Sequence, residues 1–320
     1  MPYSNTSMNG RIPNVLLAGS EEGLQLTLDD VVTVFACSEN FVPYLSVALE
    51  SLVENTSPDR RYDIVVLTRD ISPSSMLTLS HQCNRDNIGI GFLDVEAAIG
   101  NRKLPHYGHF RLETYFRLLA PSLLPSVKKA VYLDSDLVVL DDIAKLWDTD
   151  VEGKLLAATR DADTIGQIDG YDQGVGPYLA HDLGLTDPHG YFQAGVLVMN
   201  LEEFRRRTTP EELLGLATQR VWRWLDQDVL NRVADERFPN SVKEVVFDRR
   251  GGVAQFSPTA DGRISLTPDE DAELAAKLAF EGYDPVGESL YFINPSACNA
   301  SWFNSRLTYT ATIGDHVFYA

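Results

Sequence analysis

The stretch from Lys129 to Val138 reads KAVYLDSDLV, a mostly apolar run that leads into two aspartates one residue apart. Residues 129–133 have the composition of a buried strand, and Asp134 and Asp136 follow it directly. In open α/β sheets, ligands bind outside the carboxyl ends of the strands. Two hard oxygen ligands at that edge suit Mn²⁺ or Mg²⁺, which also takes phosphate oxygens. The alternative interpretation is a solvated acidic turn, because aspartate is common where strands end.

The flanking sequence predicts strands that alternate with helices. Strand-type runs occupy 31–37, 63–68, 87–95, 129–133, 155–159 and 195–200. Helices are predicted over 41–53, from Ser72-Pro73 onward, over 110–119 up to Pro121, over 201–207, from Pro210 onward and over 226–234. Residues 161–190 are predicted to form one long Gly- and Asp-rich loop, and loops of this length are often functional. The alternation predicts βαβ units and a largely parallel sheet.

Composition and charge exclude several classes of protein. The net charge of −19 would repel polyanions, so no nucleic-acid partner is expected. No apolar run approaches the length of a transmembrane segment, and residues 1–28 lack the apolar run of a signal peptide. The three cysteines stand far apart and form no CxxC pair, which is typical of reduced thiols. A soluble, cytoplasmic protein is therefore expected.

Four further segments accompany the Asp134-Ser135-Asp136 stretch in a fixed order along the chain. They are VFA at 34–36 with Asn40-Phe41, TYFRL at 114–118, YFQAGVL at 191–197 and DQDVLN at 226–231. Together these five segments resemble bacterial members of glycosyltransferase family 8, the retaining galactosyl- and glucosyltransferases that include glycogenin. The resemblance implies an α/β fold of the GT-A type. That fold has a mainly parallel mixed sheet flanked by helices, and it binds a UDP-sugar and a divalent cation at one edge.

The resemblance also implies roles for individual residues. Asp134 and Asp136 would hold Mn²⁺ or Mg²⁺, which would neutralise charge on the departing UDP. The other expected donor-binding residues are Ala36, Asn40 and Phe41 around the uridine, Ser135 beside the metal, and Arg117 near the sugar and phosphates. The alternative for Arg117 is a surface arginine on a helix.

Four more residues match positions around the transferred sugar. Asp161 and Asp226 would grip sugar hydroxyls, and Gln193 and Gln227 would lie beneath the sugar. Taken alone, the aspartates also fit turn or N-cap positions, and Gln193 also fits a residue that satisfies a backbone group. Two mechanisms stay open. One is front-face attack, with a leaving phosphate oxygen as base, and the other is double displacement through a carboxylate or amide nucleophile.

The chain departs from the family pattern at three places. Ser38-Glu39 stands where relatives carry two acidic residues, and Gln193 stands where they carry Asn. When the C-terminal segment is aligned on Trp302, Asn294 replaces a His metal ligand and Ala300 replaces a Lys. Asn294 is then expected to be a weak third metal ligand.

Three functions follow from these observations. The first is a metal-assisted, retaining hexosyltransferase that takes glucose or galactose from UDP-glucose or UDP-galactose to a saccharide, glycolipid or glycoprotein acceptor. The second is a catalytically impaired UDP-sugar-binding protein of the same fold. The third is a sugar-phosphate nucleotidyltransferase, but residues 31–44 lack its Gly-rich basic loop. The expected domains are a flexible extension (1–28), a catalytic domain (29–250) and a variable segment that closes the site (251–320).

Overall fold

One mixed sheet of eight strands runs through the part of the chain that the computed structural model describes, in the order β1-β4-β3-β2-β5-β7-β6-β8. The described residues are 17–23, 26–106, 112–168, 174–237, 241–244, 246–247, 253–254, 310–313 and 316–319. The sheet strands are β1 (Leu17–Ala18), β2 (Val31–Ala36), β3 (Tyr62–Thr68), β4 (Ile88–Asp94), β5 (Lys129–Leu133), β6 (Leu156–Arg160), β7 (Phe192–Asn200) and β8 (Val242–Glu244). Two separate pairs follow, β9 (Val246–Phe247) with β10 (Val253–Ala254) and β11 (Thr310–Ile313) with β12 (His316–Tyr319).

Most neighbouring strands of the sheet are parallel. Strands β1, β4, β3, β2 and β5 pair in parallel, whereas β7 runs antiparallel to both β5 and β6. In the central register, Val34 of β2 lies opposite Val65 of β3 and Tyr132 of β5. The mainly parallel mixed sheet predicted from the sequence is therefore confirmed. Strand β1 lies within residues 1–28, so part of the expected N-terminal extension belongs to the sheet.

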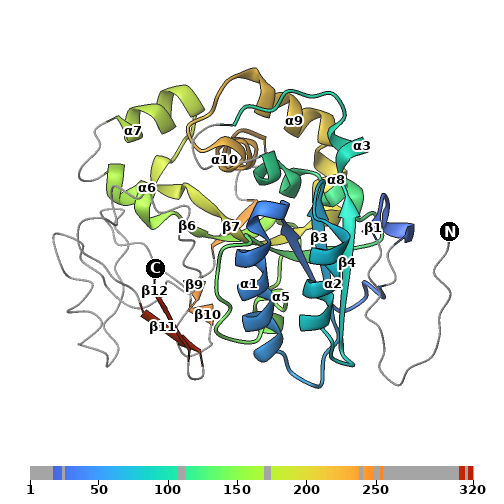
Figure 1. Cartoon of the computed structure of the whole chain (residues 1–320). Helices are drawn as coiled ribbons and strands as arrows, with labels where there is room; N and C mark the ends of the chain where they lie inside the picture. Colours follow the sequence, from blue (N-terminus) through green and yellow to red (C-terminus); the bar gives the residue numbers. More distant parts are fainter. Residues whose placement is uncertain are drawn as a thin grey trace, which may run out of the picture.

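Helices cover both faces of this sheet, which is why its strands are apolar on both sides. Val31 and Phe35 of β2 pack into one core with α1 (Val42–Glu54), α2 (Pro73–Gln82) and α5 (Ile143–Trp147). Val32 and Val34 pack into the other core with α4 (Ala120–Leu123), α8 (Leu201–Arg207), α9 (Pro210–Gln219) and α10 (Leu225–Arg237). Figure 1 shows the first group of helices together, with α8, α9 and α10 grouped away from them. Two shorter helices, η1 (Glu21–Gly23) and α3 (Glu96–Ile99), lie before β2 and after β4.

Two predicted segments differ from the structure. The segment expected as one helix over 110–119 is a 3₁₀ helix, η3 (Leu112–Leu118). Pro121 does not end a helix as expected, because it lies in the first turn of α4, where its missing N–H removes no helical hydrogen bond. The described parts of 161–190 are largely helical rather than one loop. They contain α6 (Ala162–Gly166), α7 (Val175–Pro177), the π-helix η5 (Tyr178–Leu183) and η6 (Pro188–Gly190).

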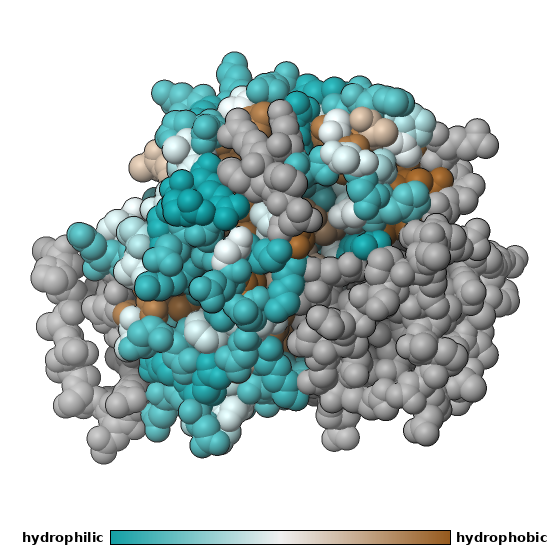
Figure 2. Space-filling model, turned by 180° about the vertical axis from the view of Figure 1, so that it is seen from behind, coloured by the Kyte–Doolittle hydropathy of each residue, from teal (hydrophilic) through white to brown (hydrophobic). Residues whose placement is uncertain are grey.

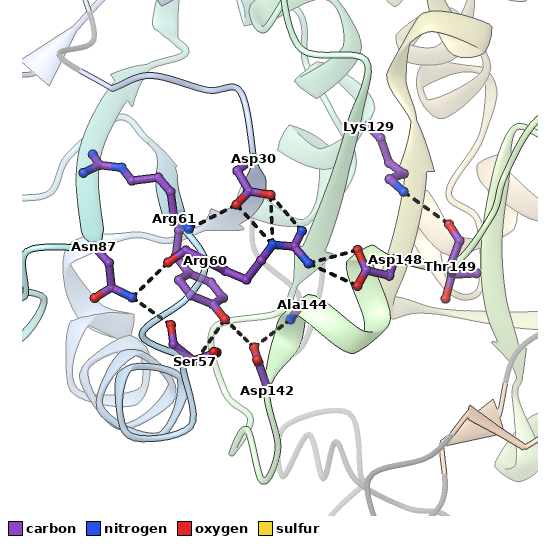
Figure 3. Close-up of polar contacts among 11 residues, drawn as sticks. Asp30, Ser57, Arg60, Arg61, Asn87, Lys129, Asp142, Ala144, Asp148 and Thr149 are labelled. Atoms are coloured by element: carbon purple, nitrogen blue, oxygen red, sulfur yellow. Dashed lines mark hydrogen bonds and ion pairs between the residues drawn. The ribbon is translucent and has the colours of Figure 1, made fainter.

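A network of charges joins the amino ends of the strands, opposite the edge where the aspartates of the candidate site lie. Arg60, just before β3, is 2.7 Å from Asp30 before β2 and 3.1 Å from Asp148 after α5. Its guanidinium and the ammonium of Lys129 both lie over the ring of Trp147. Figure 3 shows the Arg60 side chain between the carboxylates of Asp30 and Asp148. The network ties together the segments at the amino ends of β2, β3 and β5.

The described surface is polar, as the net charge suggests. Figure 2 shows the molecule from behind the view of Figure 1. Hydrophilic side chains cover most of the described atoms on this face, with small apolar areas between them. Cys37 and Cys83 are buried free thiols. Among the helices that the structure describes, none combines the length and apolar character needed to cross a membrane.

Candidate active site

The two aspartates lie at the carboxyl end of β5, where three strands meet. The backbone N–H of Asp134 donates to the carbonyl of Gly195 on β7, at 2.8 Å. The Ser135 hydroxyl donates to the carbonyl of Ala36, the last residue of β2, at 2.6 Å. Asp136 is largely buried. The turn is thus held by both neighbouring strands, so a solvated acidic turn does not describe it.

Arg117 is buried between two carboxylates. Its Nη2 donates to Oδ1 of Asp134 at 2.8 Å, and its Nε lies 2.8 Å from Oδ2 of Asp226. The guanidinium also donates to the carbonyls of Thr114 and Ala194 and lies 4.4 Å from the centre of the Tyr132 ring. Only 4% of Arg117 is exposed, so the alternative of a surface arginine is wrong. The contacts bring the Asp134 turn and the start of α10 together.

Asp226 combines burial with an acceptor atom that is not fully used. The Thr114 hydroxyl donates to its Oδ1, while its Oδ2 forms the ion pair with Arg117 but accepts no aligned hydrogen bond. Burial raises the pKa of Asp226 to about 6, against the opposing effect of the Arg117 charge. A buried acceptor of this kind suits a ligand hydroxyl.

Gln227 and Asp161 are joined by a hydrogen bond, and both Gln227 and Gln193 bind backbone groups at the start of β7. Gln227 accepts from the backbone N–H of Ala194 and donates to Oδ2 of Asp161, both at 2.8 Å. Asp161 is the N-cap of α6, and burial raises its pKa. Gln193 accepts from the backbone N–H groups of Gly195 and Val196, at 2.6 and 3.1 Å. The alternatives of an N-cap and of a satisfied backbone group therefore hold for Asp161 and Gln193.

The residues expected around uridine lie at the end of β2, next to the Asp134 turn. Ala36 ends this strand, and η2 (Glu39–Phe41) follows it with Asn40 exposed and Phe41 half-buried. The Phe41 ring lies 5.3 Å from that of Tyr44, which is 52% exposed. The structure thus places the three residues along the edge that carries the aspartates.

Asp228 is a residue whose importance the sequence did not reveal. It is fully buried and accepts from the hydroxyls of Tyr178 and Tyr191, at 2.6 and 2.7 Å, and from the backbone N–H of Trp224, at 2.9 Å. Leu225, beside Trp224, has a φ of 46°, a left-handed conformation that is unfavourable for any residue with a Cβ atom. Asp228 therefore fixes the turn that presents Asp226 and Gln227. In the sequence it is only the last residue of DQD, and no spacing predicts its tyrosine partners.

The donor set fits a hard divalent cation. Asp134 and Asp136 supply carboxylate oxygens, and Mg²⁺ or Mn²⁺ commonly completes such a site with water and phosphate oxygens. In the part of the chain that the structure describes, no group of three or more His, Cys, Asp or Glu side chains could hold a metal. Asn294, the expected third ligand, lies outside the described residues.

Comparison with known proteins identifies the larger part of the chain. The sequence model of "Glycosyl transferase family 8" matches residues 32–240. General stress protein A of Bacillus subtilis is 26% identical over 64% of this chain and 70% of its own length. The structure of galactosyltransferase LgtC in complex with donor and acceptor sugar analogs has a TM-score of 0.55 and 29% identity, covering 68% of this chain and 73% of that one. The apo structure of the bifunctional glycosyltransferase WbbM has a TM-score of 0.60 and 29% identity, covering 69% and 40%. The GT-A fold expected from the sequence is confirmed.

A second family resembles the C-terminal part. The model described as "Cell Wall Hydrolase" matches residues 226–319, and the spore cortex-lytic enzyme of Bacillus cereus is 34% identical over 135 residues. The match covers 42% of this chain and 48% of that enzyme, so the chain spans about half of this relative. Asn294 and Ala300 lie beyond the end of the first match and inside the second. They therefore do not show that a family His and Lys were lost, and Asn294 as a metal ligand stays a prediction.

Gly195 provides a direct test of the site geometry. A Cβ at this position would lie 2.7 Å from Oδ2 of Asp134 and 3.1 Å from Oε1 of Gln193. We expect Gly195→Ala to lower the free energy of unfolding by about 1–3 kcal/mol, the usual cost of overpacking, measured by urea denaturation. Gly215→Ala on α9 is the matched control, because its Cβ would meet nothing within 4 Å. We expect that variant to gain about 0.5–1 kcal/mol. Equal stabilities for the two variants would contradict the placement of Asp134 against β7.

Proposed function

Because this chain belongs to glycosyl transferase family 8, we propose that it transfers a hexose, glucose or galactose, from a UDP-sugar to a hydroxyl of its acceptor. The acceptor in this proposal is a saccharide, a glycolipid or a glycosylated protein. The anomeric configuration of the sugar is retained. Membership of this family also argues against the nucleotidyltransferase considered from the sequence.

The buried ion pairs of Arg117 carry this proposal. They join Asp134, a residue of the expected metal site, to Asp226, a residue of the expected sugar site. A UDP-sugar has a diphosphate next to a hexose, so its binding site needs a metal site and a sugar site next to each other. The acceptor atom of Asp226 that lacks an aligned hydrogen bond gives the sugar a buried partner.

The proposed mechanism assigns one task to each group. Asp134 and Asp136 would hold Mn²⁺ or Mg²⁺, which supplies neutralising charge for the departing diphosphate. Asp226 accepts a hydrogen bond from a sugar hydroxyl and orients the ring. Arg117 compensates the charges of Asp134 and Asp226, which would otherwise repel one another at a site with little water. Ala36, Asn40 and Phe41 receive the uridine.

The contacts of the candidate nucleophiles favour front-face attack. The amide oxygen of Gln227 already accepts from the backbone N–H of Ala194, and that of Gln193 already accepts from the N–H groups of Gly195 and Val196. Either group would have to give up these bonds to attack the anomeric carbon. In the front-face route, the bond from the acceptor oxygen to the anomeric carbon forms as the bond to the UDP oxygen breaks. A phosphate oxygen of the leaving group takes the acceptor proton, so no protein base is required.

A measurement of UDP release tests the function and separates it from the impaired, binding-only alternative. The chain is incubated with Mn²⁺ and a panel of UDP-sugars, with and without candidate acceptors. We expect acceptor-dependent UDP release from UDP-glucose or UDP-galactose. Tight UDP-sugar binding without release would favour the binding protein, and no binding of any UDP-sugar would contradict both.

The metal assignment is tested by Asp136→Asn. Loss of one charged ligand weakens coordination of a hard cation, so we expect Mn²⁺-dependent UDP affinity to fall by about tenfold or more in calorimetric titrations. Asp141→Asn is the matched control, because Asp141 pairs with Lys145 on the surface, 2.9 Å away. If UDP binds equally well to Asp136→Asn and to the unmodified chain in Mn²⁺, the assignment is wrong.

The raised pKa of Asp226 predicts a pH dependence of sugar binding. The ionised carboxylate is the better acceptor, and it forms as pH rises through about 6. We expect the affinity for UDP-galactose or UDP-glucose to increase between pH 5 and pH 7. The diphosphate of a UDP-sugar has no terminal phosphate that titrates in this range, so its own charge stays constant. The sign for stability is the opposite, since the folded state holds this proton more tightly than the unfolded state, and the stability from this group falls as pH rises from about 4 to about 6. An affinity for UDP-sugars that is constant with pH would exclude Asp226 as the sugar acceptor.

A second candidate function concerns residues 226–319 and rests on their similarity to cell wall hydrolases. We propose that this segment gives the chain affinity for cell wall glycan. Because the match covers less than half of the Bacillus cereus enzyme, the proposal is limited to binding. We expect the full chain to sediment with purified peptidoglycan but not with cellulose particles. A chain that stays in the supernatant with both polymers would contradict this second function and leave the first intact.

A further inference from the structure

Glu39 begins η2, the turn that carries Asn40 and Phe41, but its carboxylate binds the start of helix α2. Its Oε2 accepts from the backbone N–H of Ser72 at 2.8 Å. Its Oε1 accepts from the hydroxyls of Ser72 and Ser75, at 3.0 and 2.8 Å. Both carboxylate oxygens are therefore occupied by the first turn of a helix that lies outside the expected ligand contacts.

The backbone of the same turn is held by the segment that precedes α2. The N–H of Glu39 donates to Oδ1 of Asp70 at 3.1 Å, and the N–H of Phe41 closes the turn on the carbonyl of Ser38 at 3.0 Å. Ser72 is the N-cap of α2 and accepts from the N–H of Ser75. A carboxylate is favoured at this position because helix N-termini carry positive partial charge. The hydrogen bond from the Ser72 backbone lowers the pKa of Glu39, with the Ser75 hydroxyl acting in the same direction.

Phe41 is only partly held by the core. It is half-buried against the core beneath α1, and its ring contacts that of Tyr44, which is itself 52% exposed. Asn40 is exposed. The direction in which these two side chains point is therefore set in large part by the backbone of η2, which the Glu39 carboxylate ties to the start of α2.

We propose that Glu39 is a positioning residue for the nucleobase of the donor, which holds Asn40 and Phe41 in place through its hydrogen bonds to Ser72 and Ser75. The proposal rests on the proposed function, in which η2 receives uridine. Glu39 is the one acidic residue that this chain keeps from the acidic pair of its relatives, since Ser38 stands at the other position. A preorganised turn gains affinity because less motion is lost when the base binds.

The test separates the base from the diphosphate. Binding of UDP and of inorganic pyrophosphate is measured by calorimetry in Mn²⁺ for the full chain and for Glu39→Ala and Ser75→Ala. We expect Glu39→Ala to weaken UDP binding by about three- to tenfold, as for the loss of hydrogen bonds, and to leave pyrophosphate binding unchanged. Ser75→Ala should show a smaller loss of the same kind. The double variant should be no weaker than Glu39→Ala alone, because both changes remove the same contact.

Two controls make the outcomes decisive. Ser74→Ala removes a neighbouring hydroxyl that contacts Ser72 but not Glu39, and it should bind UDP normally. Glu39→Gln keeps the shape and one acceptor oxygen, and it should recover part of the affinity. Equal loss of UDP and pyrophosphate binding would show a general structural role and overturn the proposal, as would unchanged UDP binding in Glu39→Ala. If the unmodified chain binds pyrophosphate but not UDP, the proposed function itself fails.

Discussion

The site depends on one guanidinium held out of water between two carboxylates. Arg117 could not be buried alone, and neither could Asp226, because an isolated charge in a protein interior is strongly disfavoured. Each is stable there because the other is present, and loss of one partner from a buried pair typically costs about 3–5 kcal/mol. The surrounding backbone also follows from this requirement. The 3₁₀ geometry of η3 brings the carbonyl of Thr114 to Arg117, and the start of β7 brings that of Ala194. The candidate site is thus built on charge compensation already present in the protein.

The sequence predicts the sheet well because its strands are buried on both faces. Strand β5 was predicted with its observed bounds, and the α2 start at Ser72-Pro73 was recognised from cap and proline chemistry. The segment around Pro121 was mispredicted, because a proline that ends one helix and a proline that begins the next leave the same local pattern. The helices within 161–190 are too short for apolar residues to recur at helical spacing in the sequence. Their side chains make tertiary contacts instead.

The site was predictable only where a motif carries it. The Asp134 and Asp226 segments were found from their order along the chain, and the structure joins them through Arg117. The tyrosines that donate to Asp228 lie 37 and 50 residues away in sequence, and no local pattern announces such pairs. The C-terminal alignment relied on a single tryptophan. One aromatic residue cannot distinguish two families, and the stronger similarity there is to cell wall hydrolases.

The reversed direction of β7 has a consequence for motion. The first residues of β7, rather than its last, lie at the edge of the sheet that carries Asp134 and Asp136. The strand is paired with β5 on one side and with β6 on the other. The amide of Asp134 is bonded to Gly195, and those of Ala194 and Gly195 are bonded to Gln227 and Gln193. Amides bonded within a buried sheet generally exchange with solvent more slowly than those of segments with fewer buried contacts, which open separately. The amides of the Asp134 turn and of the start of β7 are therefore expected to be among the slowest of the described chain to exchange with solvent.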